Sequence, residues 1–529
     1  MESSNYFNRW ILSYRPLVFI LLLFVLFTAM AQFASFALIQ HYVISSFGAQ
    51  PEDISLAFQM TYIGILATLP LQFRFSKWFY TRNYLLVALG TGILFNLGCL
   101  YVQSIYIFMV LRFLIGITTS IVAGCLLIVI LSALPEKSRM VVGVSSFFGL
   151  LLSVGIIVGI AATWVVERMD WTSLYYFLMA LQIFSIIFCF LVFKGKSLHR
   201  RVPLYQIDYL GAILFVAFSF SLAYTFIYGP KYYWFEDISI QFSGFCAIFS
   251  LIFFLIHQNG LKRPSIDIKV FKYKKFWFGL LLLMVFFGIK DTINLVYGYA
   301  AGILGWSPTE IVSLGLFNVL GVIISTYIAA KVVLAKKHHL PKLLLTGFSL
   351  LLFYHFWIYT HLTPDLSYTN LVFPVFTQGF ASGLLFAPII MLCMASVPTS
   401  TGMTGIVVCA CGRFIASLNS VAGFYTLQEN YKQQFKMGLL ENVTFNFKES
   451  ILRNDMYRNY ISLSSLNKET AYEVADALLQ KNIAIQIQLL TNRAIFQVSI
   501  YIVAIAILAL ITFAVVNSYF SKKKAAARS

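Results

Sequence analysis

The sequence predicts an all-α polytopic membrane protein, and three observations support this prediction. Of the 529 residues, 60% are hydrophobic and only 11% are charged, whereas soluble domains carry about 25% charged residues. Apolar runs of about 20 residues, the length that a helix needs to cross a bilayer, recur along the chain. A transmembrane barrel needs alternating segments of roughly 10 residues, and no such pattern dominates.

Fourteen segments have the length and apolar character of membrane spans. In chain order they are residues 16–40, 55–74, 83–103, 105–131, 140–165, 174–193, 207–228, 239–258, 276–302, 309–333, 342–361, 370–393, 401–425 and 496–519. The first segment has no small-residue cleavage site behind it, so we interpret it as a retained span rather than a signal peptide.

The charges between the spans test this segmentation independently, because cytoplasmic loops are enriched in Lys and Arg. With the amino terminus inside, the inner loops hold nearly all the loop cations, while the short outer loops hold mainly Asp and Glu. We therefore expect both termini in the cytoplasm of an inner (plasma) membrane. The net charge of +18 belongs largely to these loops and does not indicate a nucleic-acid partner. The inner-loop cations include Arg74, Lys77, Arg82, Lys137, Arg139, Lys194, Arg200, Lys262, Arg263, Lys272, Lys336, Lys342, Lys522 and Arg528.

One outer segment, residues 426–495, is long and mixes both signs of charge. Long translocated regions are largely exempt from the charge rule. Within it, residues 467–490 have helical apolar spacing, which predicts a helix that lies on the outer membrane face or caps the transport path. The triplet Asn442-Val-Thr matches a glycosylation acceptor, a pattern that is common by chance.

The ninth span, residues 276–302, carries Lys290 and Asp291 well inside its apolar run. Charges at that depth cost several kcal/mol unless they face protein, water or each other. At roughly 1.5 Å per residue, Asp291 lies about 24 Å beyond the inner end, past the midplane. We hypothesise that Asp291 titrates during a transport cycle, because burial raises its proton affinity and a nearby cation opposes the rise. As helix neighbours, Lys290 and Asp291 point about 100° apart and need not pair.

Two further cations lie within the predicted spans, Arg112 in the fourth and Arg413 in the thirteenth. Buried ionisable residues in spans are expensive and are commonly functional. The excess of cations suggests a cavity for an anionic or zwitterionic substrate. The alternative is that Lys290 snorkels outward and Arg413 lies near the cytoplasmic end, which leaves only Arg112 deep.

Polar and small residues of the spans complete the set of candidate site residues. Gln32, Tyr62 and Tyr297 are candidates to line a central cavity, since aromatic rings suit flat apolar molecules. Gly155 and Gly159 are four residues apart in the fifth span, where small residues let two helices approach closely. Ordinary packing explains such glycines equally well.

Taken with the fourteen spans, these stretches resemble the major facilitator superfamily, in its fourteen-span drug:proton antiporter branch. Arg112 matches the arginine of that family's fourth span. Gly155 and Gly159 match part of its fifth-span antiporter motif, with Ile156 and Ile160 in place of a proline and a glycine. The stretch from Gln378 to Phe424 is similar to the branch's twelfth and thirteenth spans, with Arg413 on a characteristic arginine and Tyr62 on a second-span tyrosine.

The sequence also departs from that family. In the place of the cytoplasmic gate motif between spans two and three, Phe73, Lys77 and Tyr80 replace the family's glycines and aspartate. Met30 occupies the first-span position that usually carries an aspartate. The residues that usually couple protons in this branch are therefore missing.

The resemblance implies two six-helix bundles, residues 16–193 and 276–519, with residues 194–275 as a linker that contains two extra helices. The extra pair, 207–228 and 239–258, would sit between the bundles, and residues 520–529 would form a basic cytoplasmic tail. The outer loop 426–495 belongs to the second bundle. Substrate would bind near the midplane, and rocking of the bundles would expose it to either side.

We expect a secondary transporter, not an enzyme, that exports small amphipathic compounds in exchange for protons. No cofactor or metal is expected, because His41, His355 and His361 lack metal-ligand spacing and no GxxxxGK[ST] phosphate loop occurs. Two alternatives remain: uptake or facilitated transport of an organic anion, and a membrane-embedded enzyme that acts on a lipid or carotenoid. The expected partners are a small-molecule substrate, protons and the bilayer, with a periplasmic adaptor as a further candidate and a monomer as the expected state.

Overall fold

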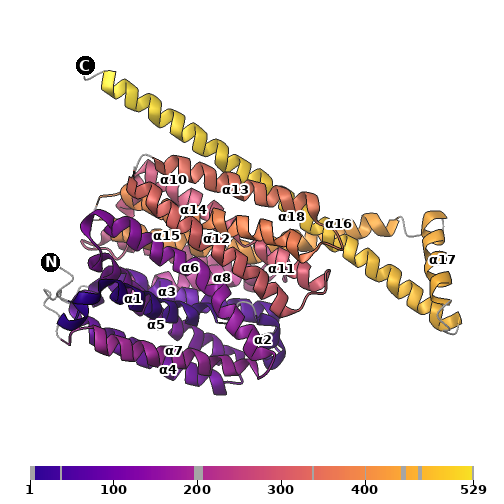
Figure 1. Ribbon diagram of the computed structural model, residues 1–529, viewed down its shortest axis with the longest axis horizontal. Coiled ribbons are helices and arrows are strands. Elements are labelled where there is room, and N and C mark those ends of the chain that lie inside the picture. Colours follow the sequence, from indigo (N-terminus) through magenta and orange to yellow (C-terminus); the bar gives the residue numbers. More distant parts are fainter. Residues whose placement is uncertain are drawn as a thin grey trace.

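The computed structural model describes residues 6–35, 39–195, 207–335, 339–398, 401–441, 448–462 and 468–526. The described residues are almost entirely helical, which confirms the all-α prediction (Figure 1). The helices are α1 Arg15–Ala34, α2 Gln40–Phe47, α3 Pro51–Trp78, α4 Thr81–Tyr101, α5 Ile105–Ala133, α6 Glu136–Val166, α7 Leu174–Val192, α8 Tyr209–Tyr228, α9 Ile238–Gly260, α10 Lys274–Lys290, α11 Ile293–Gly302, α12 Pro308–Ala335, α13 Leu340–His361, α14 Tyr368–Ala395, α15 Gly402–Leu418, η8 Asn419–Gly423 (one π-helical turn), α16 Phe424–Glu441, α17 Lys448–Ser462 and α18 Lys468–Ala526.

Thirteen helical stretches of the described residues are long and apolar enough to cross a membrane, and Thr404–Leu418 is a shorter apolar helix. The shorter helix continues through η8 into α16, so the chain runs helically from Gly402 to Glu441. This arrangement is compatible with the fourteen predicted spans. The single span predicted at residues 276–302 is divided into two helices, because α10 ends at Lys290 and α11 begins only at Ile293.

Local sequence signals explain the start of α3. Pro51 occupies the first turn, where its fixed φ suits a helix and its missing N–H is not needed. The Asp53 carboxylate accepts the backbone N–H of Gln50 at 3.1 Å, which satisfies a donor at the helix start. Before it, Gly48 closes α2 at a φ of 56°, a left-handed conformation that glycine adopts without steric cost.

The helices form two sets that meet along two seams. Helices α1, α3–α5 and α7 pack mainly on one another, with α6 against α1 and α5, and α10–α15 pack with α18, as the indigo-to-magenta and orange halves of Figure 1 show. Across the sets, α6 packs on α12 and α14, and α3 packs on α15. Any rocking of one set against the other must therefore change the α6–α12 and α3–α15 contacts.

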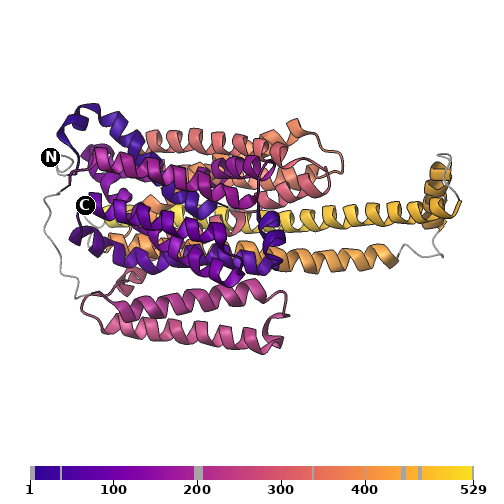
Figure 2. The same cartoon turned by 90° about the horizontal axis from the view of Figure 1, so that it is seen from below.

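The extra pair α8–α9 follows the first set in sequence but does not separate the two sets in space. It lies along one side of the molecule (Figure 2), with α8 against α3. At one end, Tyr228 donates a hydrogen bond to Asp53, and Lys231 donates one to Gln50. The resemblance implied that α8–α9 would sit between the bundles. The pair instead lies on the outer side of the α3–α15 seam, because α8 buries its apolar face on α3.

Both termini lie at one end of the molecule, and a helical hairpin made of α16, α17 and the start of α18 projects from the other end (Figure 2). The predicted helix 467–490 is continuous with the last span in α18, which has 59 residues. It extends away from the bundle and does not lie flat on it. No proline or glycine interrupts residues 468–526, so nothing in the local sequence ends the helix. Asn442 lies outside the described residues.

Candidate functional site

The break between α10 and α11 is the centre of the candidate site. Asp291 has φ −80° and ψ 3°, and the N–H of Asn294 bonds the carbonyl of Asp291 at 2.9 Å. In a continuous helix that N–H would bond the carbonyl of Lys290. The amide Nε2 of Gln378 in α14 donates to this carbonyl instead, at 3.0 Å. A side chain of a neighbouring helix therefore satisfies the acceptor that the break leaves open.

The break pairs Lys290 with Asp291. The Nζ of Lys290 lies 2.6 Å from Oδ1 of Asp291, and the hydroxyl of Ser420 donates to Oδ2 at 2.9 Å. Ser420 belongs to η8, and single π-helical turns occur frequently at functional sites. The expectation that Lys290 and Asp291 need not pair holds for a regular helix, but here the helix ends between them. Their side chains are 24% and 23% exposed, so the pair is not sealed from water.

Arg413 lies beside this pair, among aromatic rings. Its Cζ is 5.5 Å from the ring centroid of Tyr62, 5.0 Å from that of Phe287 and 5.9 Å from that of Phe386. The Nζ of Lys290 lies 5.7 Å from the same Phe287 ring. Each of these two cations is close enough to the ring for cation–π attraction. Among the described residues, no carboxylate lies within ion-pair distance of Arg413.

Helices of both sets contribute to these rings. Tyr62 of α3 donates a hydrogen bond to the carbonyl of Ala410 in α15 at 3.2 Å, across one seam. Phe386 of α14 packs edge-on against Phe148 of α6, with ring centroids 4.8 Å apart, across the other seam. The cluster that surrounds Arg413 thus lies where the two sets of helices meet, which is where the sequence places a substrate site.

The structure holds Arg112 inside the first set of helices. This side chain is fully buried; Nη1 donates to the carbonyl of Gln32 and to Oγ of Ser35, each at 3.0 Å, and Nη2 donates to the carbonyl of Phe33 at 3.1 Å. These carbonyls belong to the last turn of α1, where the helix dipole favours a positive charge. Arg112 therefore anchors the end of α1.

Gln32 belongs to a buried cluster of amides. The Nδ2 of Asn96 in α4 donates to Oε1 of Gln32 at 2.7 Å and to Oε1 of Gln182 in α7 at 3.0 Å. All three side chains are at most 3% exposed. These two hydrogen bonds join α1, α4 and α7, and they are strong because their surroundings exclude water. Nε2 of Gln32 and Oδ1 of Asn96 have no partner among the described residues.

The candidate glycines and Tyr297 lie near the α6–α12 seam. A methyl group at Gly155 would meet no heavy atom within 4 Å, so in this conformation Gly155 does not mark a close approach of helices. The close approach lies at Gly149, where a methyl group would be 3.0 Å from Cγ2 of Thr326, and at Gly315, where it would be 2.9 Å from Cγ2 of Ile156 and 3.4 Å from Oη of Tyr297. Gly159 is buried along α6.

Sequence reasoning did not single out several residues that support the break. Ser420 bonds the Asp291 carboxylate and Gln378 bonds the carbonyl of Lys290, while Asn318 bonds Gln378. Thr292 bonds Nε2 of the buried His355 at 3.1 Å. Asn318 and Gln378 could have been found from the sequence, because an amide side chain within an apolar span must have a hydrogen-bond partner when it is buried. No sequence pattern that we identified predicts the π-helical turn that carries Ser420.

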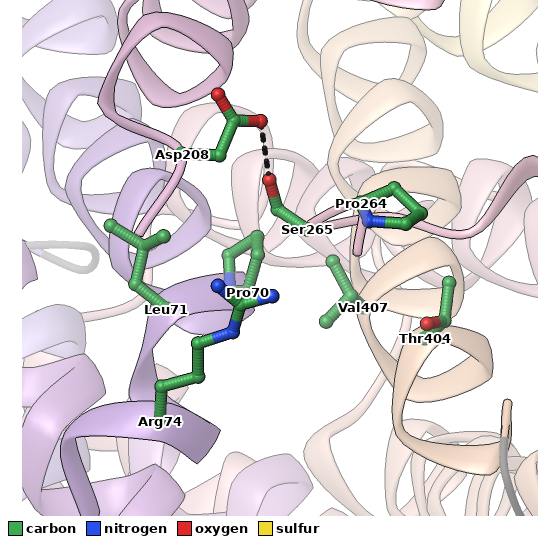
Figure 3. A pocket seen from close by; sticks show the side chains of 8 residues that line it. All are labelled: Pro70, Leu71, Arg74, Asp208, Pro264, Ser265, Thr404 and Val407. Atoms are coloured by element: carbon green, nitrogen blue, oxygen red, sulfur yellow. Dashed lines mark hydrogen bonds between the residues drawn. The ribbon is translucent and has the colours of Figure 1, made fainter. Parts of the chain in front are cut away.

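A separate cavity of about 130 Å³ opens at the end of the molecule that holds both termini (Figure 3). It lies between α3, α15 and the segment that joins α9 to α10. Arg74, Asp208, Ser265 and Thr404 contribute its polar lining. Arg74 also donates from Nη2 to the carbonyl of Arg263 at 3.0 Å, which ties the end of α3 to that segment.

Asp208 fastens the extra helix pair beside this cavity. Its carboxylate accepts the N–H of Gly211 at 2.8 Å, the Nε2 of His257 at 2.8 Å, the hydroxyl of Ser265 at 2.8 Å and the amide of Gln258. Burial by itself raises the pKa of Asp208, but these hydrogen bonds outweigh burial and lower the pKa below its ordinary value. One carboxylate therefore joins the start of α8, the end of α9 and the segment after it.

The fold and the site define a polytopic helical carrier: two sets of helices meet at a partly exposed charged cluster, with a broken helix at its centre. Comparison with known proteins identifies the family. Residues 20–418 match the family model described as Major Facilitator Superfamily, and the chain belongs to this superfamily. The resemblance noted from the sequence is thereby confirmed at the level of the superfamily and its fold.

Individual relatives are distant. The chain is 23% identical over 408 residues to the MFS-type transporter YhcA of Bacillus subtilis (strain 168), which covers 77% of this chain and 74% of that protein. It is 21% identical over 240 residues to the multidrug export protein EmrB of Escherichia coli (strain K12), which covers 44% of this chain and 45% of EmrB. Among solved structures, the human organic anion transporter MFSD10 aligns with a TM-score of 0.52 and 12% identity over 92% of this chain and 99% of that chain. The last similarity shows the fold alone.

Proposed function

We propose that this protein is a secondary transporter that exports small amphipathic compounds in exchange for protons, with Asp291 as the residue that takes up and releases the proton. Members of its superfamily are transporters, and several relatives of low identity are multidrug export proteins by name. The observation that carries the proposal is the Lys290–Asp291 pair at a helix break, partly exposed and held by Ser420 and Gln378. Broken helices form the substrate and ion sites of many transporters.

The pair dictates how a proton and a substrate affect each other. Protonation of Asp291 removes its negative charge and leaves the charge of Lys290 uncompensated. A cationic or strongly dipolar group that binds Asp291 therefore competes with the proton, and this competition is what an exchanger requires. By linkage, the proton weakens the binding of such a substrate by the same factor as the substrate weakens proton binding.

Aromatic rings provide the apolar part of the proposed substrate site. Tyr62, Phe148, Phe287 and Phe386 come from four helices and both sets, and three of them contact Arg413. Rings of this kind bind flat apolar molecules with little specificity for their outline. Substrates of the proposed transporter are therefore amphipathic, with an apolar body against the rings and a polar group near Asp291.

The second candidate function is uptake or facilitated transport of an organic anion. The specific observation in its favour is Arg413, for which the described residues offer aromatic rings and no carboxylate within ion-pair distance. An anion at Arg413 or Lys290 would bind better when Asp291 is protonated, so the anion and the proton would move together. Substrate charge and coupling direction are thus linked, and one experiment can separate the two candidates.

That experiment uses purified protein in liposomes with an imposed pH gradient and two dyes, ethidium as a cation and carboxyfluorescein as an anion. Under the first proposal, ethidium moves opposite to the proton flux and accumulates against its own gradient. Under the second, carboxyfluorescein moves with the protons. If neither dye responds to the gradient while both still exchange across the membrane, proton coupling is refuted.

The proposed orientation places both termini in the cytoplasm of the inner (plasma) membrane, since the loops at their end carry most of the cations. The hairpin of α16–α18 then projects to the outer side, where it is the proposed contact for a periplasmic adaptor. Reaction of an introduced cysteine at Met456, which is 70% exposed in α17, with an impermeant maleimide on intact cells tests this orientation. Labelling only after cell lysis would reverse it.

A further inference from the structure

A chain of buried amides connects the helix break to α12. The Nε2 of Gln378 donates to the carbonyl of Lys290 at 3.0 Å, and Nδ2 of Asn318 donates to Oε1 of Gln378 at 2.6 Å. The same Nδ2 lies 3.0 Å from the carbonyl of Val375. Gln378 is 2% exposed and Asn318 is 6% exposed. In such surroundings a broken hydrogen bond leaves an unsatisfied group, so these residues keep their geometry when a neighbour moves.

Helices α12 and α14 are closely packed, with no room for a side chain at two glycines. A methyl group at Gly379 would lie 2.1 Å from the backbone oxygen of Asn318, and one at Gly321 would lie 2.5 Å from the backbone oxygen of Phe376. The two backbones are therefore in direct contact next to the Asn318–Gln378 bond. Because packed helices are stiff, a shift of α14 at Gln378 displaces α12 rather than deforming the contact.

The same part of α12 faces the other set of helices. Gly315, one turn before Asn318, is the position where Ile156 of α6 approaches α12. The hydroxyl of Tyr297 in α11 lies against the same glycine, and this buried hydroxyl has no hydrogen-bond partner among the described residues. Both halves of the broken helix thus reach the α6–α12 seam, α10 through Gln378 and Asn318, and α11 through Tyr297.

From this convergence we propose that α12 is the coupling element between the Lys290–Asp291 pair and the rocking contact of the two sets, with Asn318 and Gln378 as positioning residues that transmit the change. The inference rests on the proposed function, in which Asp291 exchanges a proton. Protonation of Asp291 weakens its pair with Lys290 and changes the restraint on the last turn of α10. Gln378 follows the carbonyl of Lys290, Asn318 follows Gln378, and α12 shifts against α6.

Charged and titratable groups from the neighbouring helices act on the same site. Arg413 of α15 and Lys290 both lie over the ring of Phe287, at 5.0 and 5.7 Å from its centroid. His355 of α13 bonds Thr292, which follows Asp291 directly. Arg413 stays charged throughout the pH range of the test, and the amide relay is separated from both residues by variants that carry no charge change.

The test measures the distance between the two sets as a function of pH and needs no ligand. Spin labels are placed at cysteines substituted for the exposed Met169, after α6, and the exposed Thr309, at the start of α12, in a background without the native cysteines. We expect the distance distribution of the parent to change between acidic and neutral pH. In Gln378→Met and in Asn318→Leu, the pH-dependent change falls at least threefold. In the control Thr377→Val, whose hydroxyl bonds only its own helix at Phe373, the change remains within 1.5-fold of the parent.

Two further variants make the outcome decisive. If the amides act as one relay, the double variant Gln378→Met with Asn318→Leu loses no more of the pH response than either single variant, whereas independent structural effects add. Asp291→Asn removes the response altogether under the proposed function. A response that depends on Asp291 but survives in both amide variants overturns the relay and leaves the proposed function standing. A parent without any pH response, or with one that Asp291→Asn preserves, overturns both.

Discussion

The ammonium group of Lys290 lies 2.6 Å from the carboxylate of the next residue, Asp291, near the middle of a membrane-spanning segment. Consecutive residues of a regular helix cannot pair in this way because their side chains diverge by about 100°. They pair here because α10 ends at Lys290 and Asp291 leaves the helical conformation. The ion pair, its hydrogen bond from Ser420 and the aromatic neighbours of Lys290 form one unit that both candidate functions use.

Replacement of Asp291 tests the proton site. Asp291→Asn keeps the hydrogen bond from Ser420 but cannot titrate, so we expect pH-gradient-driven ethidium transport in proteoliposomes to fall at least tenfold. Exchange of ethidium without a gradient remains within about threefold of the parent. Asp365→Asn, at an exposed carboxylate between α13 and α14, serves as the control and leaves both activities unchanged. Gradient-driven transport that persists in Asp291→Asn refutes the assignment.

Arg413 decides between the two candidate functions. Arg413→Gln removes a charge that faces three aromatic rings, so we expect the affinity for carboxyfluorescein to fall about tenfold, which corresponds to about 1.4 kcal/mol. Ethidium transport changes less than twofold, because a cation gains nothing from Arg413. Dye binding is measured by fluorescence anisotropy with purified protein. Equal losses for both dyes contradict a role of Arg413 in charge selection.

Arg112 has a structural effect rather than a selective one. In Arg112→Ala the carbonyls of Gln32 and Phe33 lose their donor, at a cost of about 1–3 kcal/mol for each unsatisfied group. We expect a lower melting temperature and equal losses of transport for cationic and anionic dyes. Arg112→Lys recovers only part of the stability, because a lysine cannot donate from a planar fork to three acceptors. A selective loss of anion transport at normal stability contradicts this interpretation.

The stability that Asp208 provides depends on pH. Its folded-state pKa lies below the ordinary value, so this contribution is present above the unfolded-state value of about 3.9 and is lost as pH falls through the folded-state value. We expect Asp208→Asn to lower the melting temperature at pH 7 and to approach the parent below about pH 4. Melting in detergent is followed by tryptophan fluorescence. Asp267→Asn, which affects a cap of the short helical turn Ile268–Lys272, is the matched control, and an equal effect of both variants at pH 7 contradicts the prediction.

Alanine substitutions at two glycines compare a position of close helix contact, Gly379, with a position that has free space around it, Gly155. Gly379→Ala places a methyl group 2.1 Å from the backbone oxygen of Asn318, so we expect strong destabilisation, by roughly 1–3 kcal/mol as for other overpacked sites. Gly155→Ala meets no neighbour within 4 Å and leaves the melting temperature unchanged or slightly higher, because alanine favours a helix. If Gly155→Ala stays stable but stops transport, Gly155 is needed in another conformation of the cycle, as its match to the antiporter motif predicts.

Several features of the site were open to prediction because they depend on local composition. Asp291, Lys290 and Arg413 stand out as charges in apolar segments, and the structure brings these three together around Phe287. Arg112 and Gln32 stand out for the same reason, but their hydrogen bonds lie within the first set of helices. The free-energy cost of burying a polar side chain indicates that the residue has a role. It does not tell whether the partner of that side chain is a helix end or a substrate.

The sequence by itself determined the membrane class, the approximate limits of most spans, and the loops that carry positive charge. These properties follow from the transfer free energy of about 20 consecutive residues, which each segment has on its own. Only the tertiary structure decided the break after Lys290, the π-helical turn that carries Ser420, the position of α8–α9 on α3, and the amide chain to α12. Each of these depends on contacts between residues far apart in the chain, such as Gln378 and Lys290, 88 positions apart, and no local free energy specifies such a partner.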